Sequence, residues 1–368
     1  MPETTVEDGR RSWRHRLGRS LQGVLAGLVL FVVGFPLLWW NEGRAVRTAR
    51  TVGEGASEVL SVDPKTVDPQ HEGRLVHVTG VASTNEVIRD PQFGVSVRAL
   101  RLRRTVEMYQ WREEARSEGW TVPPGGTDRP PSTTVSRVWS ERLVDSSGFS
   151  DPVQRRNPPS MPVRSEERVV GRATLGAFTL SSELVLRVDR FEAVQPETLP
   201  PGAPHGLHVD RGGFFLGTNP SRPEVGDVRV RFAAVLPVTV SVVARQERGR
   251  LEPSRSRSGR QLEMVEVGVH GAAEMFAAAL HRNRLSTWLL RLAGAVLLFV
   301  GLATALRPVV AEIELAPLLG PLFRLGLGWL SAVVVAALTL VTVAASIVVH
   351  GVSVTPLMRR YLRRRRTR

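Results

Sequence analysis

The stretch LQGVLAGLVLFVVGFPLLWW, residues 21–40, contains no charged side chain. A helix rises about 1.5 Å per residue, so a segment of this length covers roughly the 30 Å hydrocarbon core of a bilayer. Trp39 and Trp40 stand at its far end, where amphipathic rings favour the headgroup level of a membrane. The stretch therefore predicts a first transmembrane helix with two aromatic interface anchors.

The basic segment before this span, residues 1–20, predicts its orientation. Arginines that flank a span tend to stay in the cytoplasm, so the chain should emerge on the opposite side. A cleaved signal peptide also has a basic start and an apolar centre, but its cleavage site needs small residues, whereas this span ends in Pro-Leu-Leu-Trp-Trp. We interpret residues 21–40 as an uncleaved anchor.

A second apolar run, residues 287–306, predicts a helix that returns the chain to the cytoplasm. Trp288 and Arg291 lie near its outer edge. A guanidinium one turn inside the membrane can extend outward along its own stem, so we interpret Arg291, like Trp288, as an interface anchor. The alternative is a charged functional site within the membrane.

Four glycines in the two spans predict close contact between helices. Gly23 and Gly27 are four residues apart in the first span, and Gly294 and Gly301 lie in the second. Small residues let two helix backbones approach closely, although glycine is common in membrane helices in general. We expect these four positions to mediate helix packing.

A third apolar region, residues 325–357, is long for one span and short for two. A single crossing would leave an arginine-rich tail outside, whereas a tight hairpin near His350 and Gly351 would keep it in the cytoplasm. One crossing helix followed by an interfacial stretch is a third alternative, and the sequence leaves all three open. Residues 307–324 are interpreted as a cytoplasmic amphipathic connector on the membrane surface.

The last segment, residues 358–368, holds seven arginines, which is half of the formal charge of +14. Basic clusters beside a hydrophobic span are suited to anionic lipid. No part of the middle region combines a basic stripe with interleaved aromatics, so nucleic acid is not an expected partner. We therefore predict a lipid-contacting tail formed by Arg359, Arg360, Arg363, Arg364, Arg365 and Arg366.

Residues 41–285 carry the soluble mass and are predicted to form a β-rich domain outside the cytoplasm. Apolar and polar residues alternate with a period of two in several segments, which turn-forming Pro, Gly and Asn residues separate. This pattern predicts an antiparallel sheet, sandwich or barrel. The expected strands are residues 73–81, 95–102, 106–111, 134–143, 184–191, 228–235 and 238–244. Residues 44–60 and 265–280 are expected to be helical, and residues 251–259 to be an exposed loop.

Little of the sequence points to catalysis. The chain has no cysteine, which excludes disulfides, thiolate zinc sites and cysteine nucleophiles. His205, His208 and Asp210 could begin a metal site, but they lie in a Pro/Gly-rich connection, and we interpret the histidines as exposed loop residues. Trp111 and Trp139 are expected to pack in or cap the β core, with a binding groove as the alternative. We expect no catalytic residue, no metal and no cofactor.

Several stretches resemble one family of membrane proteins over most of the chain, in order and with matching topology. They are residues 41–46 (NEGRAV), 71–73 (HEG), 76–80 (VHVTG), 106–113 (VEMYQWRE), 225–232 (VGDVRVRF), 240–246 (VSVVARQ), 287–294 (TWLLRLAG) and 299–302 (FVGL). The family that they resemble is transmembrane protein 43, also called LUMA, which occurs in eukaryotes and bacteria.

The resemblance implies a membrane scaffold and supplies no catalytic residues. It implies that eukaryotic members sit in the endoplasmic reticulum and inner nuclear membrane, self-associate, and bind lamins and emerin. Those members have a fourth C-terminal span, whereas this chain ends in arginines soon after its third apolar region. Because Lys65 is the only lysine among 49 basic residues, we expect a bacterial source, in which lamin partners would not apply.

The leading hypothesis is therefore a scaffold that forms homo-oligomers and binds membrane lipids and unidentified proteins through residues 41–285. The expected location is a bacterial cell membrane, or the endoplasmic reticulum or inner nuclear membrane for a eukaryotic source. A channel or transport component is the alternative, although the spans hold almost no ionisable residue apart from Arg291. A lipid-modifying hydrolase is a third interpretation and lacks a nucleophile motif.

Overall fold

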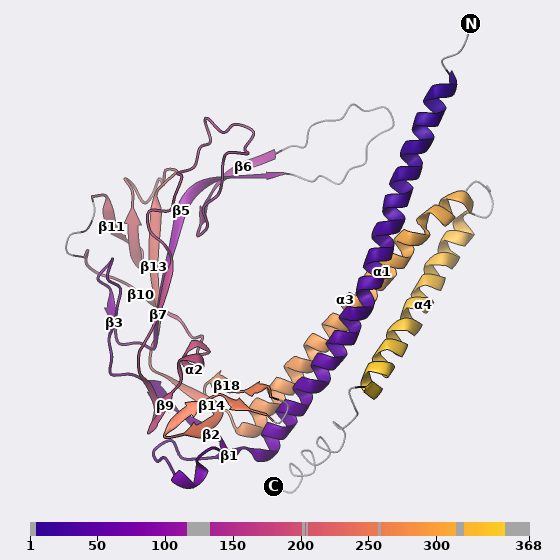
Figure 1. Cartoon of the computed structure of the whole chain (residues 1–368). Coiled ribbons are helices and arrows are strands. Elements are labelled where there is room, and N and C mark those ends of the chain that lie inside the picture. The colour runs from indigo at the N-terminus through magenta and orange to yellow at the C-terminus, as the bar shows by residue number, and fades with distance from the viewer. Residues whose placement is uncertain are drawn as a thin grey trace. The chain divides into compact units, whose positions relative to one another are not determined.

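The computed structural model describes residues 5–115, 133–200, 203, 205–256, 259–313 and 320–349. The chain divides into two compact units that alternate along the sequence (Figure 1). A helical unit comprises Met1–Val59, Arg255–Leu262 and Ala272–Arg368, and a β-rich unit comprises Leu60–Ser254 and Glu263–Gly271.

Three long helices form the helical unit: α1 (Thr5–Glu58), α3 (Ala272–Ile313) and α4 (Gly320–Val349). α1 and α3 lie side by side in Figure 1, and each contains an apolar stretch long enough to cross a membrane. They run antiparallel, because Gly27 of α1 meets Gly301 of α3 while Gly55 meets Phe276. The chain between them therefore leaves and returns at the same end of the helix pair.

Both helices extend well beyond the predicted spans. α1 continues without a break to Glu58 and α3 already begins at Ala272, so the β-rich part is narrower than the expected residues 41–285. Extending a helix costs little once its first turns exist, because each further residue adds one hydrogen bond. The predicted helix of residues 44–60 is thus the end of α1, and that of residues 265–280 starts later than expected.

The described part of the third apolar region is one continuous helix. α4 begins at Gly320 and α3 continues to Ile313, so the described parts of the predicted connector, residues 307–324, are helical. α4 packs against both other helices around buried Leu38, Leu298 and Val335. The possible turn near residue 350 and the arginine tail, residues 358–368, lie outside the described residues.

The first sheet of the β-rich unit closes on itself into a small barrel. Its strands pair in the order β2, β8, β9, β15 and β14, and β14 pairs back with β2. Only the β9–β15 contact in this ring is parallel. This order matches the five-stranded Greek-key barrel of an OB-fold. With β1 and β18 added at its edges, the sheet comprises β1 (Leu60–Ser61), β2 (Leu75–Ser83), β8 (Ala173–Leu175), β9 (Phe178–Leu180), β14 (Val238–Glu247), β15 (Arg250–Glu252) and β18 (Met264–Val267).

The second sheet grows from the two long connections between barrel strands. Its main strands pair in the order β11-β12-β13-β5-β6. In addition, β7 pairs with β5 and β10 pairs with β13, and every one of these pairings is antiparallel. Its strands are β5 (Arg101–Ala115), β6 (Thr133–Ser140), β7 (Glu166–Val169), β10 (Glu192–Val194), β11 (Leu207–Asp210), β12 (Gly213–Leu216) and β13 (Val228–Val235). The short elements elsewhere are η1 (Pro69–His71), β3 (Ile88–Arg89), β4 (Ser96–Val97), α2 (Ser182–Leu186), β16 (Ser254–Arg255) and β17 (Gln261–Leu262).

The period-two alternation located most of these strands. The segments predicted at residues 73–81, 134–143, 228–235 and 238–244 correspond to β2, β6, β13 and β14, and residues 106–111 lie inside the longer β5. The predicted antiparallel arrangement holds for most pairings, and the exceptions are β1–β2 and β9–β15.

Three local predictions are wrong. Residues 184–191 do not begin as a strand, because the Ser181 side chain caps helix α2 by accepting a hydrogen bond from the Leu184 amide. Residues 251–259 are not simply an exposed loop, because Leu251 is fully buried in barrel strand β15. Residues 265–280 are not helical throughout, because they begin in β18.

One hydrophobic core lies between the barrel and the second sheet. Valines of β2 and β14 and the inward residues of β5 and β13 belong to the same buried cluster. Arg104 also points inward from β5, and its Nη1 donates to Oδ2 of buried Asp90 at 2.5 Å. An ion pair of this kind adds less net stability than apolar packing would, but losing one partner would leave a buried charge unpaired.

A buried histidine on β2 links β1, β2 and the segment that follows β18. The Nε2 of His77 donates to the carbonyl oxygen of His270 at 2.9 Å, and its Nδ1 accepts from the Ser61 hydroxyl at 3.2 Å. This arrangement uses a neutral imidazole, with one donor and one acceptor. Burial lowers the pKa of His77 below its ordinary value of 6.5.

We expect the β-rich unit to lose stability as the pH falls below about 6.5, because the unfolded chain then takes up a proton that the folded state binds only at lower pH. A His77→Gln variant should have a lower melting temperature at pH 8 and a weaker dependence on pH between about pH 7 and pH 5. Thermal unfolding of detergent-solubilised protein, followed by circular dichroism, measures both effects. Equal pH dependence in the two proteins would contradict this role of His77.

Candidate functional site: the joined membrane helices

The backbones of the two membrane helices touch at a pair of glycines. A Cβ atom added to Gly27 would lie 2.6 Å from the backbone nitrogen of Ala305 and 2.7 Å from the carbonyl oxygen of Gly301. One added to Gly301 would lie 2.5 Å from the nitrogen of Phe31. These distances are too short for a side chain, so both positions require glycine for the helices to stay this close.

A second pair of glycines continues the contact. A Cβ on Gly294 would lie 2.6 Å from Leu38 Cδ2, and a Cβ on Gly34 would lie 2.7 Å from Leu298 Cδ2. In each helix the two glycines are seven residues apart, and seven residues return an α-helix to within about 20° of the same face. The two helices thus pair along matching glycine stripes.

Gly23 differs from the expectation that it packs together with Gly27. A Cβ added there would meet nothing within 4 Å in the described structure. Four residues turn a helix about 40° past a full circle, so Gly23 faces further from α3 than Gly34 does. The residue that partners Gly27 along the contact is therefore Gly34.

A polar cluster joins the same helices at the end of the apolar stretch. The buried carboxylate of Glu42 accepts two hydrogen bonds from Arg291, at 2.7 Å from Nε and 2.8 Å from Nη2. Asn41, also fully buried, donates from its side-chain amide to the carbonyl oxygen of Thr287 at 3.1 Å. The Arg291 pair is bidentate, the geometry that gives such pairs both strength and orientation.

Arg44 extends this cluster by one turn. Its guanidinium donates to the side-chain oxygens of Asn283, Asn41, Ser286 and Thr287 at 3.1 to 3.2 Å. The Asn283 amide donates in turn to the carbonyl oxygen of Ala45 at 3.0 Å. We call this set the polar clamp, and its members are Asn41, Glu42, Arg44, Asn283, Thr287 and Arg291.

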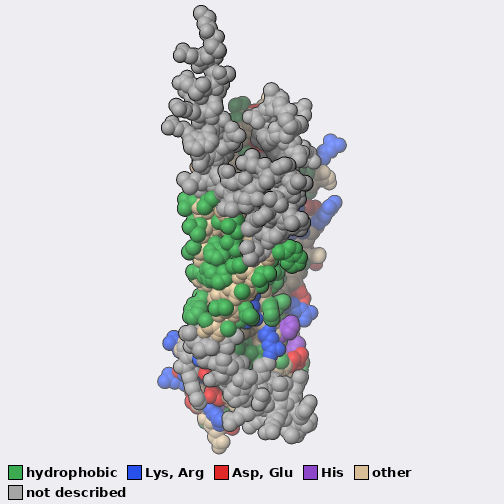
Figure 2. Space-filling model, turned by 90° about the vertical axis from the view of Figure 1, so that its right-hand side faces the viewer, with side chains coloured by type: hydrophobic (Ala, Val, Ile, Leu, Met, Phe, Trp, Pro, Cys, Tyr) green, Lys and Arg blue, Asp and Glu red, His purple; other side chains and the backbone are tan. Residues whose placement is uncertain are grey.

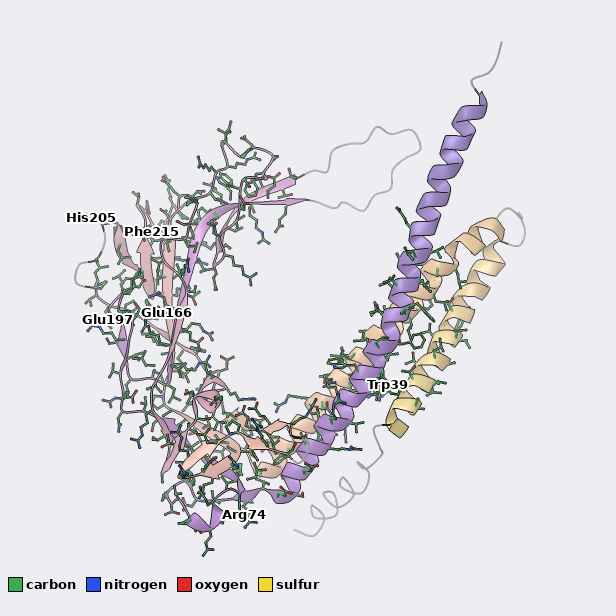
Figure 3. The ribbon with its side chains drawn as sticks, viewed as in Figure 1. Trp39, Arg74, Glu166, Glu197, His205 and Phe215 are labelled. Atoms are coloured by element: carbon green, nitrogen blue, oxygen red, sulfur yellow. The ribbon has the colours of Figure 1, made fainter. Side chains whose placement is uncertain are left out.

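The clamp changes the interpretation of the predicted interface anchors. Arg291 does not simply extend toward water, because it pairs with Glu42 and also lies 4.8 Å from the centre of the Trp288 ring. Trp288, Trp39 and Trp40 are 66%, 40% and 54% exposed, and Figure 3 shows Trp39 on α1. Their position at a headgroup level stays a prediction.

Leucines and valines are exposed along the apolar stretches of both membrane helices. Exposed leucine and valine side chains cover the flank of the helices that Figure 2 shows in green. The exposed leucines and valines of the two helices include Leu25, Leu28, Val29, Val32 and Val33 on α1, and Leu289, Leu292, Val296 and Val300 on α3. A continuous apolar surface of this extent fits lipid, since soluble proteins rarely expose one.

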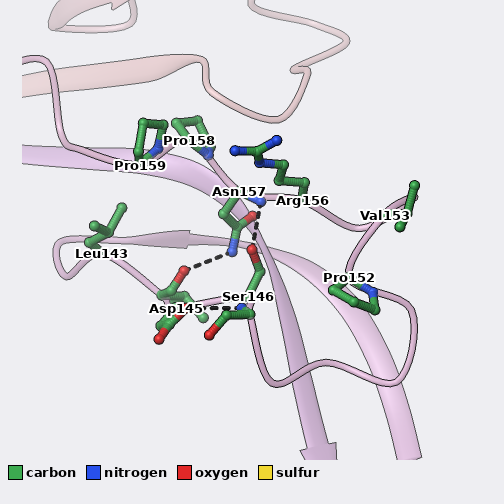
Figure 4. Close-up of a pocket in the computed structure, with 11 residues that line it drawn as sticks. Leu143, Asp145, Ser146, Pro152, Val153, Arg156, Asn157, Pro158 and Pro159 are labelled. Carbon is green, nitrogen blue, oxygen red and sulfur yellow. Dashed lines mark hydrogen bonds between the residues drawn. The ribbon is translucent and has the colours of Figure 1, made fainter.

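The β-rich unit contains a pocket of about 610 Å³ in the segment that follows β6 (Figure 4). Prolines and small apolar side chains line most of it, and Val153 at its rim is 86% exposed. Asp145 and Arg156 add one charge of each sign. The pocket therefore offers mainly apolar atoms, with one carboxylate and one guanidinium among them.

Two buried amide side chains hold this segment against β5. Asn157 accepts from the Trp111 amide at 2.8 Å and donates to the carbonyl oxygens of Trp111 at 2.9 Å and Val144 at 3.1 Å. Gln110 accepts from the Val144 amide at 2.8 Å and donates to the Arg142 carbonyl at 3.0 Å. The pocket is therefore fixed by hydrogen bonds to a strand of the second sheet.

Trp111 and Trp139 lie on the side of the second sheet that faces away from the core. The Trp139 ring is 5.1 Å from Tyr109 and 6.4 Å from Phe215, and Arg229 lies 4.6 Å above it. Both indoles are partly buried on this outer face, so the expectation that they pack in or cap the core is wrong. Figure 3 labels Phe215 beside the neighbouring His205.

The histidines in the 203–210 connection come close to no further ligand. His208 lies on β11 opposite Phe215, and His205 precedes that strand. Within the described ranges, no group of three His, Asp or Glu side chains is arranged to hold a metal ion.

Breaking the Glu42–Arg291 pair should destabilise the helix pair. Glu42→Gln or Arg291→Gln alone should cost about 3–5 kcal/mol, because each leaves a buried charge without its partner. The double variant Glu42→Met/Arg291→Met should have a free energy of unfolding closer to that of the wild type, because it leaves neither charge unpaired. Unfolding in mixed detergent and SDS micelles measures the cost, and Glu114→Gln, in the exposed Arg112–Glu114 pair, is the control with an expected change within about 0.5 kcal/mol. Equal effects of Glu42→Gln and Glu114→Gln would contradict the clamp.

The glycine contacts allow a second comparison. Gly301→Val should separate the helices and lower the melting temperature, because its side chain would overlap the backbone of Phe31. Gly23→Val should change it little, since space is open around Gly23. Melting curves of the two variants in the same detergent measure the difference. Similar decreases in melting temperature for both variants would show that the effect comes from helix propensity and not from the contact between the helices.

Known proteins resemble this chain over most of its length. The family model for transmembrane protein 43 matches residues 108–352. Human transmembrane protein 43 is 34% identical in an alignment 364 positions long, which covers 93% of this chain and 90% of the human protein. The mouse protein is 36% identical, covering 90% of this chain and 85% of its own, and the Drosophila melanogaster homolog is 31% identical over 75% and 74%. No solved structure matches the chain. The chain belongs to the transmembrane protein 43 family.

Proposed function

We propose that this protein is a membrane scaffold that self-associates and binds protein or lipid partners through its β-rich unit. The polar clamp is the observation that carries the proposal, because Glu42 and Arg291 join the two membrane helices into one anchor. A joined anchor holds the chain between the helices at one membrane surface without needing a partner to do so. The proposed role uses no catalytic residue, cofactor or metal.

The pocket in the β-rich unit supports a protein partner. Its exposed Val153 and its proline-rich lining form an apolar site on a rigid support, the combination found at the centre of many interfaces. The proposed location of this unit is outside the cytoplasm of a bacterial cell, which follows from the basic N-terminal segment and the arginine-rich composition.

The clamp also favours the scaffold over a channel or transport component. A charged residue in a span often marks a path for ions or substrates. Here Arg291 is the single charged residue of residues 287–306, and its guanidinium is satisfied inside the helix pair by Glu42. It is thus used to bind one helix to the other.

Site-specific photocrosslinking in membranes tests the proposal. A photoreactive amino acid at Val153 should give bands with partner proteins that the same probe at Val87, which is exposed but does not line the pocket, does not give. Copies carrying two different tags should also copurify. Identical band patterns from both positions, together with no copurification of tagged copies, would exclude the scaffold role.

A further inference from the structure

A second, smaller hollow lies on the second sheet, away from the pocket beside β6. It has a volume of about 240 Å³ and is bordered by β5, β10, β13 and the turn between β11 and β12, all labelled or traceable in Figure 1. Four polar side chains line it, and they are Thr105, Gln195, Arg211 and Arg231. The rest of the lining comes from small residues and backbone, so these four side chains decide its chemistry.

The sheet register places these side chains together. Arg231 on β13 pairs with Thr105 on β5 on one side and with Gly213 on β12 on the other. Gly213 adds no side chain beside Arg231, and a Cβ there would collide with the Val230 carbonyl oxygen at 2.2 Å. The glycine at this position therefore lets β12 and β13 approach closely beside Arg231.

Arg211 reaches the hollow from a tight turn. Arg211 and Gly212 connect β11 to β12 and have φ angles of 37° and 83°, as a two-residue hairpin turn of the I′ kind requires. Asn, Asp and Gly are the residues that adopt this conformation most easily, so arginine is not chosen for the turn itself. The same turn kind recurs with Arg248 and Gly249 between β14 and β15, and Arg248 is not one of the residues that line this hollow.

Charge distinguishes the hollow from its surroundings. Within the described residues, none of its four polar side chains has a hydrogen-bond or ion-pair partner. The arginines on neighbouring positions of β5 and β13 are paired, since Arg103 contacts Glu167, Arg104 contacts Asp90 and Arg229 contacts Glu107. Two arginines without a carboxylate partner thus line the same hollow as one glutamine and one threonine.

We propose that this hollow binds a phosphate group, either free phosphate or the phosphate monoester of a lipid headgroup. Guanidinium groups donate paired hydrogen bonds that match phosphate oxygens, and the amide and hydroxyl can each donate one more. The volume is below the roughly 300 Å³ at which pockets for larger ligands begin, which limits the bound part to a small group. This site is separate from the pocket beside β6 that the proposed scaffold function uses. A negative result for one proposal therefore does not affect the other.

Calorimetric titration of the full-length protein in detergent with inorganic phosphate tests the site. Arg211→Asn and Arg231→Gln should each weaken binding at least tenfold. Arg211→Asn should keep the melting temperature, because asparagine suits the turn. The matched control is Arg248→Asn, which removes an arginine from the same kind of turn without touching the hollow and should leave binding unchanged.

A second titration with mixed micelles identifies the source of the phosphate. If a lipid headgroup is the ligand, micelles that contain phosphatidic acid should bind more tightly than inorganic phosphate. If free phosphate is the ligand, the micelles should bind no more tightly than inorganic phosphate. Either outcome supports the site, provided that Arg231→Gln weakens the binding. Phosphatidylcholine micelles, which lack a phosphate monoester, are the blank. Absence of binding to both phosphate and phosphatidic acid, or equal weakening by Arg248→Asn, would overturn the proposal.

Discussion

The architecture depends on the direct contact between α1 and α3. Lipid tails are as apolar as leucine, so the hydrophobic effect does not hold two helices together inside a membrane, and close packing and polar contacts must do so. Gly27 and Gly301 provide the close packing, and Glu42 and Arg291 provide the polar contact. Because the helices run antiparallel, the end of α1 and the start of α3 lie at the same end of the pair.

Much of the fold could be predicted because hydropathy and alternation are local signals. Residues 21–40 and 287–306 are recognisable by length and lack of charge, and β13 coincides with the alternating residues 228–235. The closed barrel could not be predicted, since it depends on a parallel pairing between β9 and β15, two strands of three residues far apart in the chain. The ends of α1 and α3 differ from the predicted span ends for another reason. Residues outside a span can continue a helix at little cost in free energy, and hydropathy does not indicate where such a helix ends.

The clamp shows where sequence reasoning about the site stops. Glu42 lies just after the first span and Arg291 is a charge inside the second, but their pairing joins residues 249 positions apart. A signal for the helix contact was nevertheless present. Gly27 and Gly34 have the same spacing of seven as Gly294 and Gly301, and matching spacings in two spans indicate two complementary stripes.

Disulfide trapping tests the antiparallel contact most directly. Because the chain has no native cysteine, only the introduced cysteines can form a disulfide within it. In a Gly34→Cys/Leu298→Cys variant the two side chains face each other, because a Cβ on Gly34 lies 2.7 Å from the Leu298 side chain. Oxidation in native membranes should yield an intramolecular disulfide, seen as a mobility shift of the monomer that reductant reverses. A Gly23→Cys/Leu298→Cys variant should not form it. If the first variant stayed unlinked in the monomer, or linked only between two chains, the contact on which the architecture depends would be wrong.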